Sequence, residues 1–376
     1  MRYTHAILVC CFVMVLLSCS REETYKINNI DGVQHIENFS ESWDENKRIT
    51  LEFVRKVGEL DAEDEHFLLF KPRDCVRDSK ENNFVLHRAD LFIYKYDPDW
   101  NFLTSFGSEG QGPGEINSTY GFTIDNNDIL YVMDHGNMRT QKFTTEGEPA
   151  GSFLLPHQTF SGIVQSNGNS VFLGRSFDRQ DINSVPEPKM LVMVDPEGNK
   201  IKYFADAQQY ESYSAMYIVN DLEFTIDNDD NVYAAFSHLN RIEKYSPDGE
   251  LIYTMTRPLN YPIEHKEVMF KMEVDGREME FPDQVMSYVS YFLDFDSEDR
   301  LWVMTYNKQP EDKGSASSSI KEEDIMDFEL FSKDGVLLTR VPAPERFYKF
   351  RIYDDLLYLI DPYFEMCVYI YKIVER

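Results

Sequence analysis

A six-fold internal repeat is the feature that most constrains the fold of this chain. An aromatic residue stands six positions after a strand-end anchor in each of six pairs: Asp78/Phe84, Asp125/Tyr131, Ser166/Phe172, Asp227/Tyr233, Asp296/Trp302 and Ile352/Tyr358. The anchors recur about every 55 residues, a spacing typical of propeller blades. The repeat therefore predicts an architecture and indicates which loops share a face, but it names no ligand and no reaction.

The second repeat unit shows the pattern within one blade. Strands are predicted at 121–125, 129–133, 140–143 and 151–155, with a turn of Asn and Asp at 126–128. Asn and Asp suit such turns because their side chains bond to nearby backbone and tolerate positive φ. Four antiparallel strands in one unit indicate a propeller blade.

The last unit contains only three predicted strands, at 349–353, 356–360 and 367–374. An unassigned strand at 48–57 precedes the first blade, and we expect it to complete the sixth. A ring closed in this way leaves no long exposed edge. The predicted fold is therefore all-β: a six-bladed β-propeller over 48–376, with four antiparallel strands per blade and the last blade completed by an N-terminal strand.

Residues 1–18 have the features of an export signal. Arg2 precedes an apolar run from Ala6 to Leu17, which is shorter than the ~20 residues of a membrane-spanning helix. The segment Leu16-Leu17-Ser18-Cys19 resembles the lipobox of bacterial lipoproteins, which implies cleavage before Cys19 and attachment of lipid (palmitate) to it. An ordinary secretory signal and an uncleaved anchor are the alternatives. Residues 19–47 are then a lipidated tether.

The residues that follow Cys19 refine the expected location. Ser20-Arg21-Glu22-Glu23 resembles the acidic tetrapeptides that direct Bacteroidota lipoproteins to the outer face of the outer membrane. The expected location is the cell envelope, as a surface-exposed outer membrane lipoprotein bound to the membrane through its lipid. A charged, flexible tether is the alternative interpretation.

Charge and cysteine content restrict the partners and the chemistry. The formal net charge of −29 opposes binding to phosphate backbones, so we expect no nucleic-acid partner. A soluble surface explains such a charge, and binding of cations or basic partners is the sharper alternative. Cys75 and Cys367 are predicted at opposite ends of non-adjacent strands, beyond the ~7 Å that a disulfide spans. We therefore expect two buried free thiols.

The segment from Phe106 to Ile116 (Phe-Gly-Ser-Glu-Gly-Gln-Gly-Pro-Gly-Glu-Ile) resembles a connection of NHL-repeat propellers. It is most similar to the six-bladed β-propeller lipoproteins of Bacteroidota. The segments 137–143 and 240–245 match the NHL Asn/Arg to Phe/Tyr strand. The resemblance covers 48–376 and weakens in blades three, five and six, where Asp327 and Cys367 replace the arginine. It implies architecture and export rather than an activity.

Two local motifs resemble ligand-binding loops, but each lacks residues that such a loop requires. The glycine-rich segment 110–114 lacks the Lys and the following helix of a phosphate-binding loop, so a tight connection between blades is expected. The acidic segment 227–231 lacks the Gly and Glu of a calcium loop, because Val232 and His238 stand at those positions. We expect a hairpin turn there, and no cofactor or metal motif is recognised.

Strand direction sorts the loops between two faces. Tight turns join strands one to two and three to four on one face, whereas the long segments 107–115, 174–189, 205–221, 258–288 and 307–323 all fall on the other. Loops of this length are usually functional or disordered. Residues 311–319 are expected to be disordered, and 263–272 to form a short helix with Val268, Met269 and Met272 on one side.

Polar residues at the ends of second and third strands are the candidates for a site on this long-loop face. They are expected around one mouth of the channel, and they are His87, Asp134, His135, Arg139, His238, Arg241, Tyr306 and Asp361. Most such residues are surface groups or satisfied polar groups, and the arginines equally suit bonding to strand ends. No nucleophile with a base and an orienting group is recognisable.

Three functions follow from these features. The favoured one is a non-catalytic binding module that holds a glycan, a peptide or an envelope protein through its long-loop face. The alternative is a metal-dependent propeller hydrolase or lyase with its site at the channel mouth, for which His and carboxylate ligands must converge. A structural or signalling lipoprotein of an envelope complex is the third.

Overall fold

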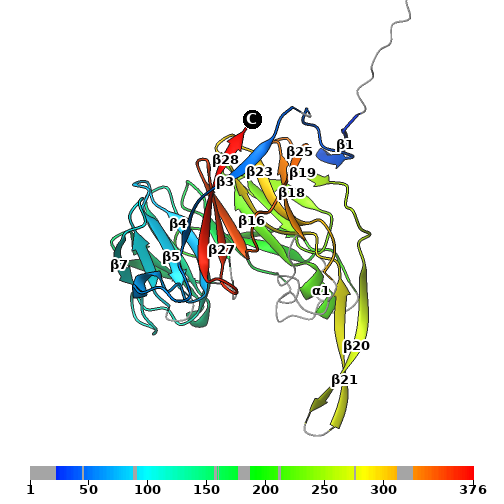
Figure 1. The fold of residues 1–376 in the computed structure, drawn as a ribbon. Helices are drawn as coiled ribbons and strands as arrows, with labels where there is room; N and C mark the ends of the chain where they lie inside the picture. The colour runs from blue at the N-terminus through cyan, green and yellow to red at the C-terminus, as the bar shows by residue number, and fades with distance from the viewer. Residues whose placement is uncertain are drawn as a thin grey trace, which may run out of the picture.

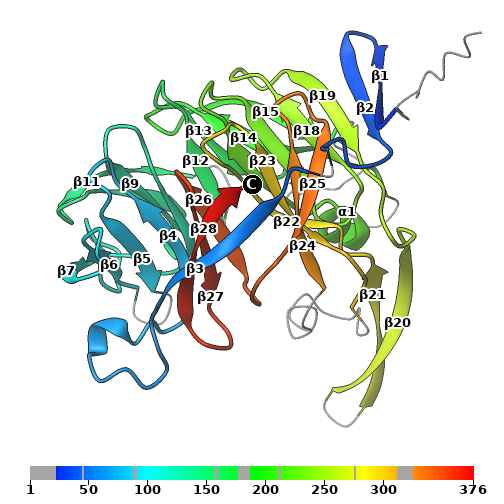
Figure 2. The same cartoon turned by 45° about the horizontal axis from the view of Figure 1, so that its top comes forward.

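The computed structural model describes residues 23–44, 46–87, 91–155, 159, 161–176, 187–210, 213–274, 277–310 and 325–376. Six sheets surround a central channel, as the six-bladed prediction requires (Figures 1 and 2). The first three blades comprise β4 (Pro72–Arg77), β5 (Asn83–His87), β6 (Ile93–Tyr96) and β7 (Phe102–Phe106); β8 (Thr119–Ile124), β9 (Ile129–Asp134), β10 (Arg139–Thr144) and β11 (Pro149–Leu154); and β12 (Gly162–Val164), β13 (Ser170–Leu173), β14 (Lys189–Val194) and β15 (Lys200–Asp206).

The other three blades repeat the same antiparallel order. They comprise β16 (Leu222–Ile226), β17 (Val232–Phe236), β18 (Ile242–Tyr245) and β19 (Leu251–Thr256); β22 (Ser290–Phe295), β23 (Leu301–Tyr306), β24 (Met326–Phe331) and β25 (Leu337–Pro342); and β26 (Lys349–Tyr353), β27 (Leu356–Asp361), β28 (Cys367–Glu375) and β3 (Ile49–Val57). The helical segments are η1 (Glu65–Phe67), η2 (His135–Asn137) and α1 (Tyr213–Val219).

The repeating aromatic residues fill the blades. All six are buried, between 0% and 7% exposed. In three blades the aromatic side chain also donates a hydrogen bond to the anchor carboxylate: Tyr131 to Asp125 at 3.2 Å, Tyr233 to Asp227 at 3.1 Å and Trp302 to Asp296 at 2.7 Å. The same carboxylates accept backbone N–H groups of the turns that follow. The six-residue spacing thus joins turn formation to core packing, and the acidic segment 227–231 is a hairpin turn as predicted.

The predicted closure of the ring is confirmed. β3 (Ile49–Val57) pairs antiparallel with β28 from Val368↔Val57 to Glu375↔Ile49. The sixth blade therefore takes one of its strands from the opposite end of the chain, and this edge is paired. Cys75 and Cys367 are both free and buried, as expected.

Part of the expected tether is folded against the propeller. β1 (Tyr25–Ile30) and β2 (Val33–Asn38) form a hairpin, and β2 pairs parallel with β19. Ile36 is 2% exposed, and the Asn38 side chain donates to the carbonyls of Thr256 and Gly335 at 3.0 Å each. The fourth blade is consequently a six-stranded sheet, and the assignment of all of 19–47 to a tether is too broad.

The helix expected at 263–272 is wrong. β20 (His265–Val274) and β21 (Arg277–Met286) instead pair residue for residue in a long hairpin that projects from the propeller body (Figure 1). The following segment 277–286 supplies a strand partner for 265–274, which a helical period of 3.6 fitted to 263–272 alone does not take into account. The expectation of disorder at 311–319 concerns residues outside those described.

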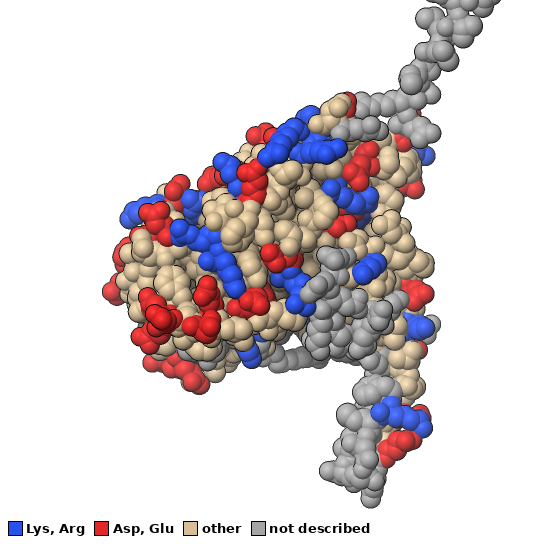
Figure 3. Space-filling model, viewed as in Figure 1, with Lys and Arg blue, Asp and Glu red and all other residues tan. Residues whose placement is uncertain are grey.

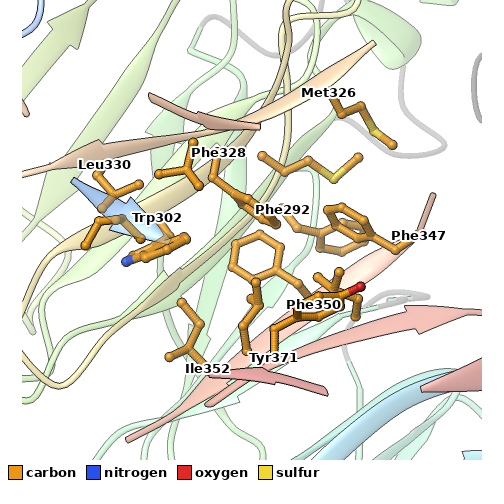
Figure 4. Close-up of a cluster of buried hydrophobic side chains, with 14 of the residues drawn as sticks. Phe292, Trp302, Met326, Phe328, Leu330, Phe347, Phe350, Ile352 and Tyr371 are labelled. Carbon is orange, nitrogen blue, oxygen red and sulfur yellow. The ribbon is translucent and has the colours of Figure 1, made fainter. Parts of the chain in front are cut away.

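The largest packed cluster lies between the fifth and sixth blades. Figure 4 shows Trp302, Phe328, Phe347 and Phe350 meeting there, each no more than 1% exposed. The Phe328 ring is stacked on Phe347 with centroids 5.4 Å apart and meets Phe350 edge-on at 5.1 Å. Burial of each such ring contributes roughly 1.5–3 kcal/mol to the free energy of folding, so this cluster stabilises the packing of the two blades against each other.

Candidate binding site at the channel mouth

Three inner strands depart from regular pairing near their first residues. The register skips Arg73 in β4, Tyr120 and Gly121 in β8, and Tyr291 and Phe292 in β22. β-Bulges of this kind re-aim side chains and are frequent beside functional sites. Because all inner strands run in the same direction, these irregularities lie at one end of the channel, the end that carries the long loops.

Arg73 is the central cation of this channel mouth. It is 3% exposed, and its guanidinium lies 5.6 Å from the ring centroid of Tyr120, 5.7 Å from that of Tyr348 and 5.4 Å from that of Tyr363. Its Nη1 donates to the Tyr363 hydroxyl at 3.0 Å. Electrostatic attraction to aromatic faces favours a cation in this position.

A buried ion cluster lies next to Arg73 along the channel. Arg351 donates to both oxygens of Asp74, at 3.0 and 2.9 Å, and Lys349 donates to Oδ2 at 2.5 Å. Burial alone would raise the pKa of Asp74, but the positive charges of Arg351 and Lys349 outweigh it and hold that pKa below its usual range. Burial, reinforced by the charge of Arg351, lowers the pKa of Lys349.

Glu223 of β16 faces the same space from the opposite side of the ring. It borders a cavity of about 20 Å³ in the channel. The residue is half-buried, and the surface it exposes faces this cavity. Burial raises its pKa to about 8, against the opposing charge of Lys349. Burial therefore favours the protonated form of this carboxyl, which can donate a hydrogen bond.

A larger pocket of about 300 Å³ adjoins the mouth between the fifth and sixth blades, and Glu345, Phe364 and Tyr369 are among its lining residues. One loop joins it to the mouth. Asp361 accepts the backbone N–H groups of residues 363, 364 and 365 at 2.8–3.0 Å, which fixes this loop between β27 and β28. Tyr363 of the loop bonds Arg73 while Phe364 lines the pocket, so one loop contributes to both the mouth and the pocket.

The candidates at and between the adjoining ends of β9 and β10 have defined partners. Arg139 pairs with Asp134 at 3.0 Å and donates to the carbonyls of Gln111, Gly112 and Glu115 at 2.7–3.0 Å. It therefore clamps the glycine-rich connection, where Gly107 has a φ of 91° and a Cβ would lie 2.8 Å from a backbone carbonyl oxygen. His135 is half-buried and meets the Tyr120 ring edge-on at 6.0 Å, so it borders the mouth. Burial lowers its pKa.

The remaining candidates lie at separate positions around the ring. His87 is buried and stacked on Tyr94 at 4.0 Å, and Arg241 lies 3.6 Å over Phe236. Buried His238 contacts the Ser287 carbonyl oxygen through Nδ1 at 2.9 Å, and burial lowers its pKa. Tyr306 is buried against Tyr288, and Asp361 shapes the loop described above. Among the residues that the structure describes, no three metal-binding side chains of His, Cys, Asp or Glu converge.

Comparison with known proteins identifies the family of the chain. The family model DUF5128, described as a 6-bladed beta-propeller, matches residues 26–312. The chain belongs to this family. No curated protein matches its sequence.

Several solved structures have the same fold as this DUF5128 propeller at low sequence identity. A DUF4221 family member from Bacteroides vulgatus ATCC 8482 is 8% identical with a TM-score of 0.57, covering 89% of this chain and 99% of that one. A Bacteroides fragilis NCTC 9343 protein, named for its inferred export, is 12% identical with a TM-score of 0.54, covering 91% and 99%. A streptogramin B lyase is 11% identical with a TM-score of 0.51, covering 90% and 100%.

Two further observations bear on location and partners. None of the helices in the described part of the chain has the length and apolar character needed to cross a bilayer. Acidic and basic side chains are interspersed on the face of the molecule shown in Figure 3.

The residues at the mouth of this DUF5128 propeller carry a sequence signal that the strand-end analysis missed. Arg73, Tyr120 and Tyr291 each stand five positions before a repeat anchor, and Asp74 and Glu223 stand four positions before one. Charged residues inside strands that should be buried on both faces are exceptional. Searching these offsets would have found the site, whereas offsets after the aromatic residue found mainly groups with structural partners.

Proposed function

We propose that this protein is an exported, lipid-anchored binding module that holds a glycan at the channel mouth and the adjoining pocket. The observation that carries the proposal is the set of three tyrosines around the buried guanidinium of Arg73, beside a pocket lined by the same loop that carries Tyr363. Tyrosine rings offer apolar faces to sugar C–H groups, and their hydroxyls and the nearby charged groups suit sugar hydroxyls.

A glycan fits this mouth better than a peptide strand does. Recognition of an extended peptide by strand addition requires a free sheet edge. The inner strands each leave one edge unpaired, but these edges line the narrow channel, whose cavity of about 20 Å³ is too small for an extended peptide. The mouth supplies convergent polar groups on a rigid scaffold, the usual character of a small-ligand site. The metal-dependent alternative has no ligand set in the described part of the chain.

Replacing Tyr363 by alanine tests the glycan proposal. Tyr363 is 43% exposed and contributes a ring and a hydroxyl to the mouth, so its removal is expected to weaken a glycan identified by array screening at least tenfold. Tyr25→Ala is the matched control, because Tyr25 is 39% exposed on the β1–β2 hairpin, and it should change affinity less than twofold. Equal affinities for both variants, or no glycan bound by the wild type, would contradict the proposal.

Lipid attachment at Cys19 is proposed from its lipobox alone. In a Bacteroidota host, Cys19→Ala is expected to abolish incorporation of labelled palmitate and to release the protein from the membrane fraction. Cys10→Ala removes a cysteine from within the signal and should leave both properties intact. Surface protease treatment of intact cells then tests exposure on the outer membrane. Unchanged labelling of Cys19→Ala would refute lipidation at this residue.

A further inference from the structure

Arg73 differs from the other buried arginines in lacking an anion. Besides Arg73, the arginines of the described chain with the least exposed surface are Arg175 and Arg257, and both pair with carboxylates: Arg175 with Asp221 at 3.1 Å and Arg257 with Glu329 at 2.7 Å. Arg73 has no acidic partner within 4 Å among the described residues, and its buried Nε has no hydrogen-bond partner there. A buried charge without a counterion is costly, so this guanidinium is set up to receive one.

The hydrogen-bond donors at the mouth indicate the kind of ligand group that fits there. The guanidinium offers a planar fork of donors, which matches a carboxylate. Glu223, whose protonated form is favoured by burial, adds another donor within the same channel. The Arg73 side chain donates through Nη1 to the Tyr363 hydroxyl, so its unsatisfied Nε remains for an incoming carboxylate oxygen while Tyr363 stays in the mouth.

We propose that the mouth recognises the carboxylate of an acidic sugar, with Arg73 binding the carboxylate and the surrounding tyrosines contacting the sugar ring. This inference rests on the glycan-binding function proposed above and specifies its ligand class. The net charge of −29 repels densely charged polyanions over long distances. An isolated uronic acid residue within a glycan therefore suits the protein better than a continuous polyanion.

Ligands that differ only in the carboxylate test the proposal on the full-length wild-type protein. Galacturonate is expected to bind at least tenfold more tightly than its methyl ester, which has the same ring without the charge, and than galactose. Acetate is the arm without a sugar ring and should bind at least tenfold more weakly than galacturonate. Calorimetry measures the affinities, and the rise in melting temperature provides an independent readout.

Variants of Arg73 locate the interaction. Arg73→Gln should remove the preference for galacturonate over its ester, and Arg73→Lys should retain only part of it, because lysine keeps the charge without the fork. Arg175→Gln is the matched control, since Arg175 is also buried and lies 4.1 Å over the Tyr217 ring but has its own carboxylate. This control should preserve the preference, and circular dichroism establishes that each variant is folded.

The outcomes separate this inference from the broader function. Equal affinity for galacturonate and its ester, while a neutral glycan still binds at the mouth, would overturn the carboxylate inference alone. Acetate binding as tightly as galacturonate would overturn the assignment to a sugar. Absence of binding by every glycan, acidic or neutral, would overturn both proposals.

Discussion

Asp74→Asn is expected to lower the free energy of unfolding by about 3–5 kcal/mol, the usual cost of breaking a buried ion pair from one side. Asp74 is fully buried and neutralises both Arg351 and Lys349. The amide retains the size of the side chain but leaves two cations in the channel. Lys349, whose pKa is already lowered by burial and by Arg351, can lose its proton, whereas Arg351 stays charged.

Asp355→Asn provides the matched control for this experiment. Asp355 pairs with Lys372 at 3.2 Å within the sixth blade, and both side chains are about half exposed. The identical substitution should therefore lower the free energy of unfolding by less than about 1 kcal/mol. Urea unfolding followed by tryptophan fluorescence measures both variants. Similar losses for the two variants would show that the channel cluster contributes no more than a surface pair.

Glu223→Gln is expected to make the protein more stable at pH 8 while leaving its stability near pH 4.5 unchanged. Folding raises the pKa of Glu223 from its usual 4.5 to about 8, so between these values the native state holds a proton that the unfolded state has released. The free energy of unfolding of the wild type must therefore fall as pH rises through this window, by up to about 1.4 kcal/mol per pH unit. Glutamine resembles the protonated form and does not titrate.

Unfolding curves at pH 5, 6.5 and 8 measure this difference. Glu250→Gln is the control: a hydrogen bond from Lys202 lowers the pKa of exposed Glu250 below its usual 4.5, so this carboxyl is ionised in both states from pH 5 to 8 and the difference between this variant and the wild type should stay constant. A constant difference between Glu223→Gln and the wild type across the range would show that Glu223 is ionised in the folded channel.

The fold was largely predictable because its signals are local and repeated. The aromatic residues six positions after each anchor, such as Tyr233 after Asp227, both fill a blade and bond its turn. Counting strands also predicted that 48–57 closes the ring, because an unpaired strand and an incomplete blade have one economical solution. The β1–β2 hairpin was missed, since its pairing with β19 depends on a parallel contact between distant segments.

The candidate site was harder to predict for a physical reason. Arg139 and Asp361 were correctly noticed as unusual polar residues, but their hydrogen bonds show them fixing loops. Arg73 was not identified from the sequence because its unusual property is the absence of a carboxylate partner. A missing counterion is visible only when every neighbouring strand is in place.

The sequence by itself determined the six blades, the closing strand, the free thiols and the face that carries the long loops, because periodicity and strand direction depend only on order along the chain. Tertiary structure alone decided which polar residues meet. The bulges in β4, β8 and β22 turn side chains from three blades toward one channel mouth, and Asp74 of the first blade neutralises cations of the sixth. Such contacts join residues far apart in sequence, so the charge of each group is fixed by neighbours that no local pattern specifies.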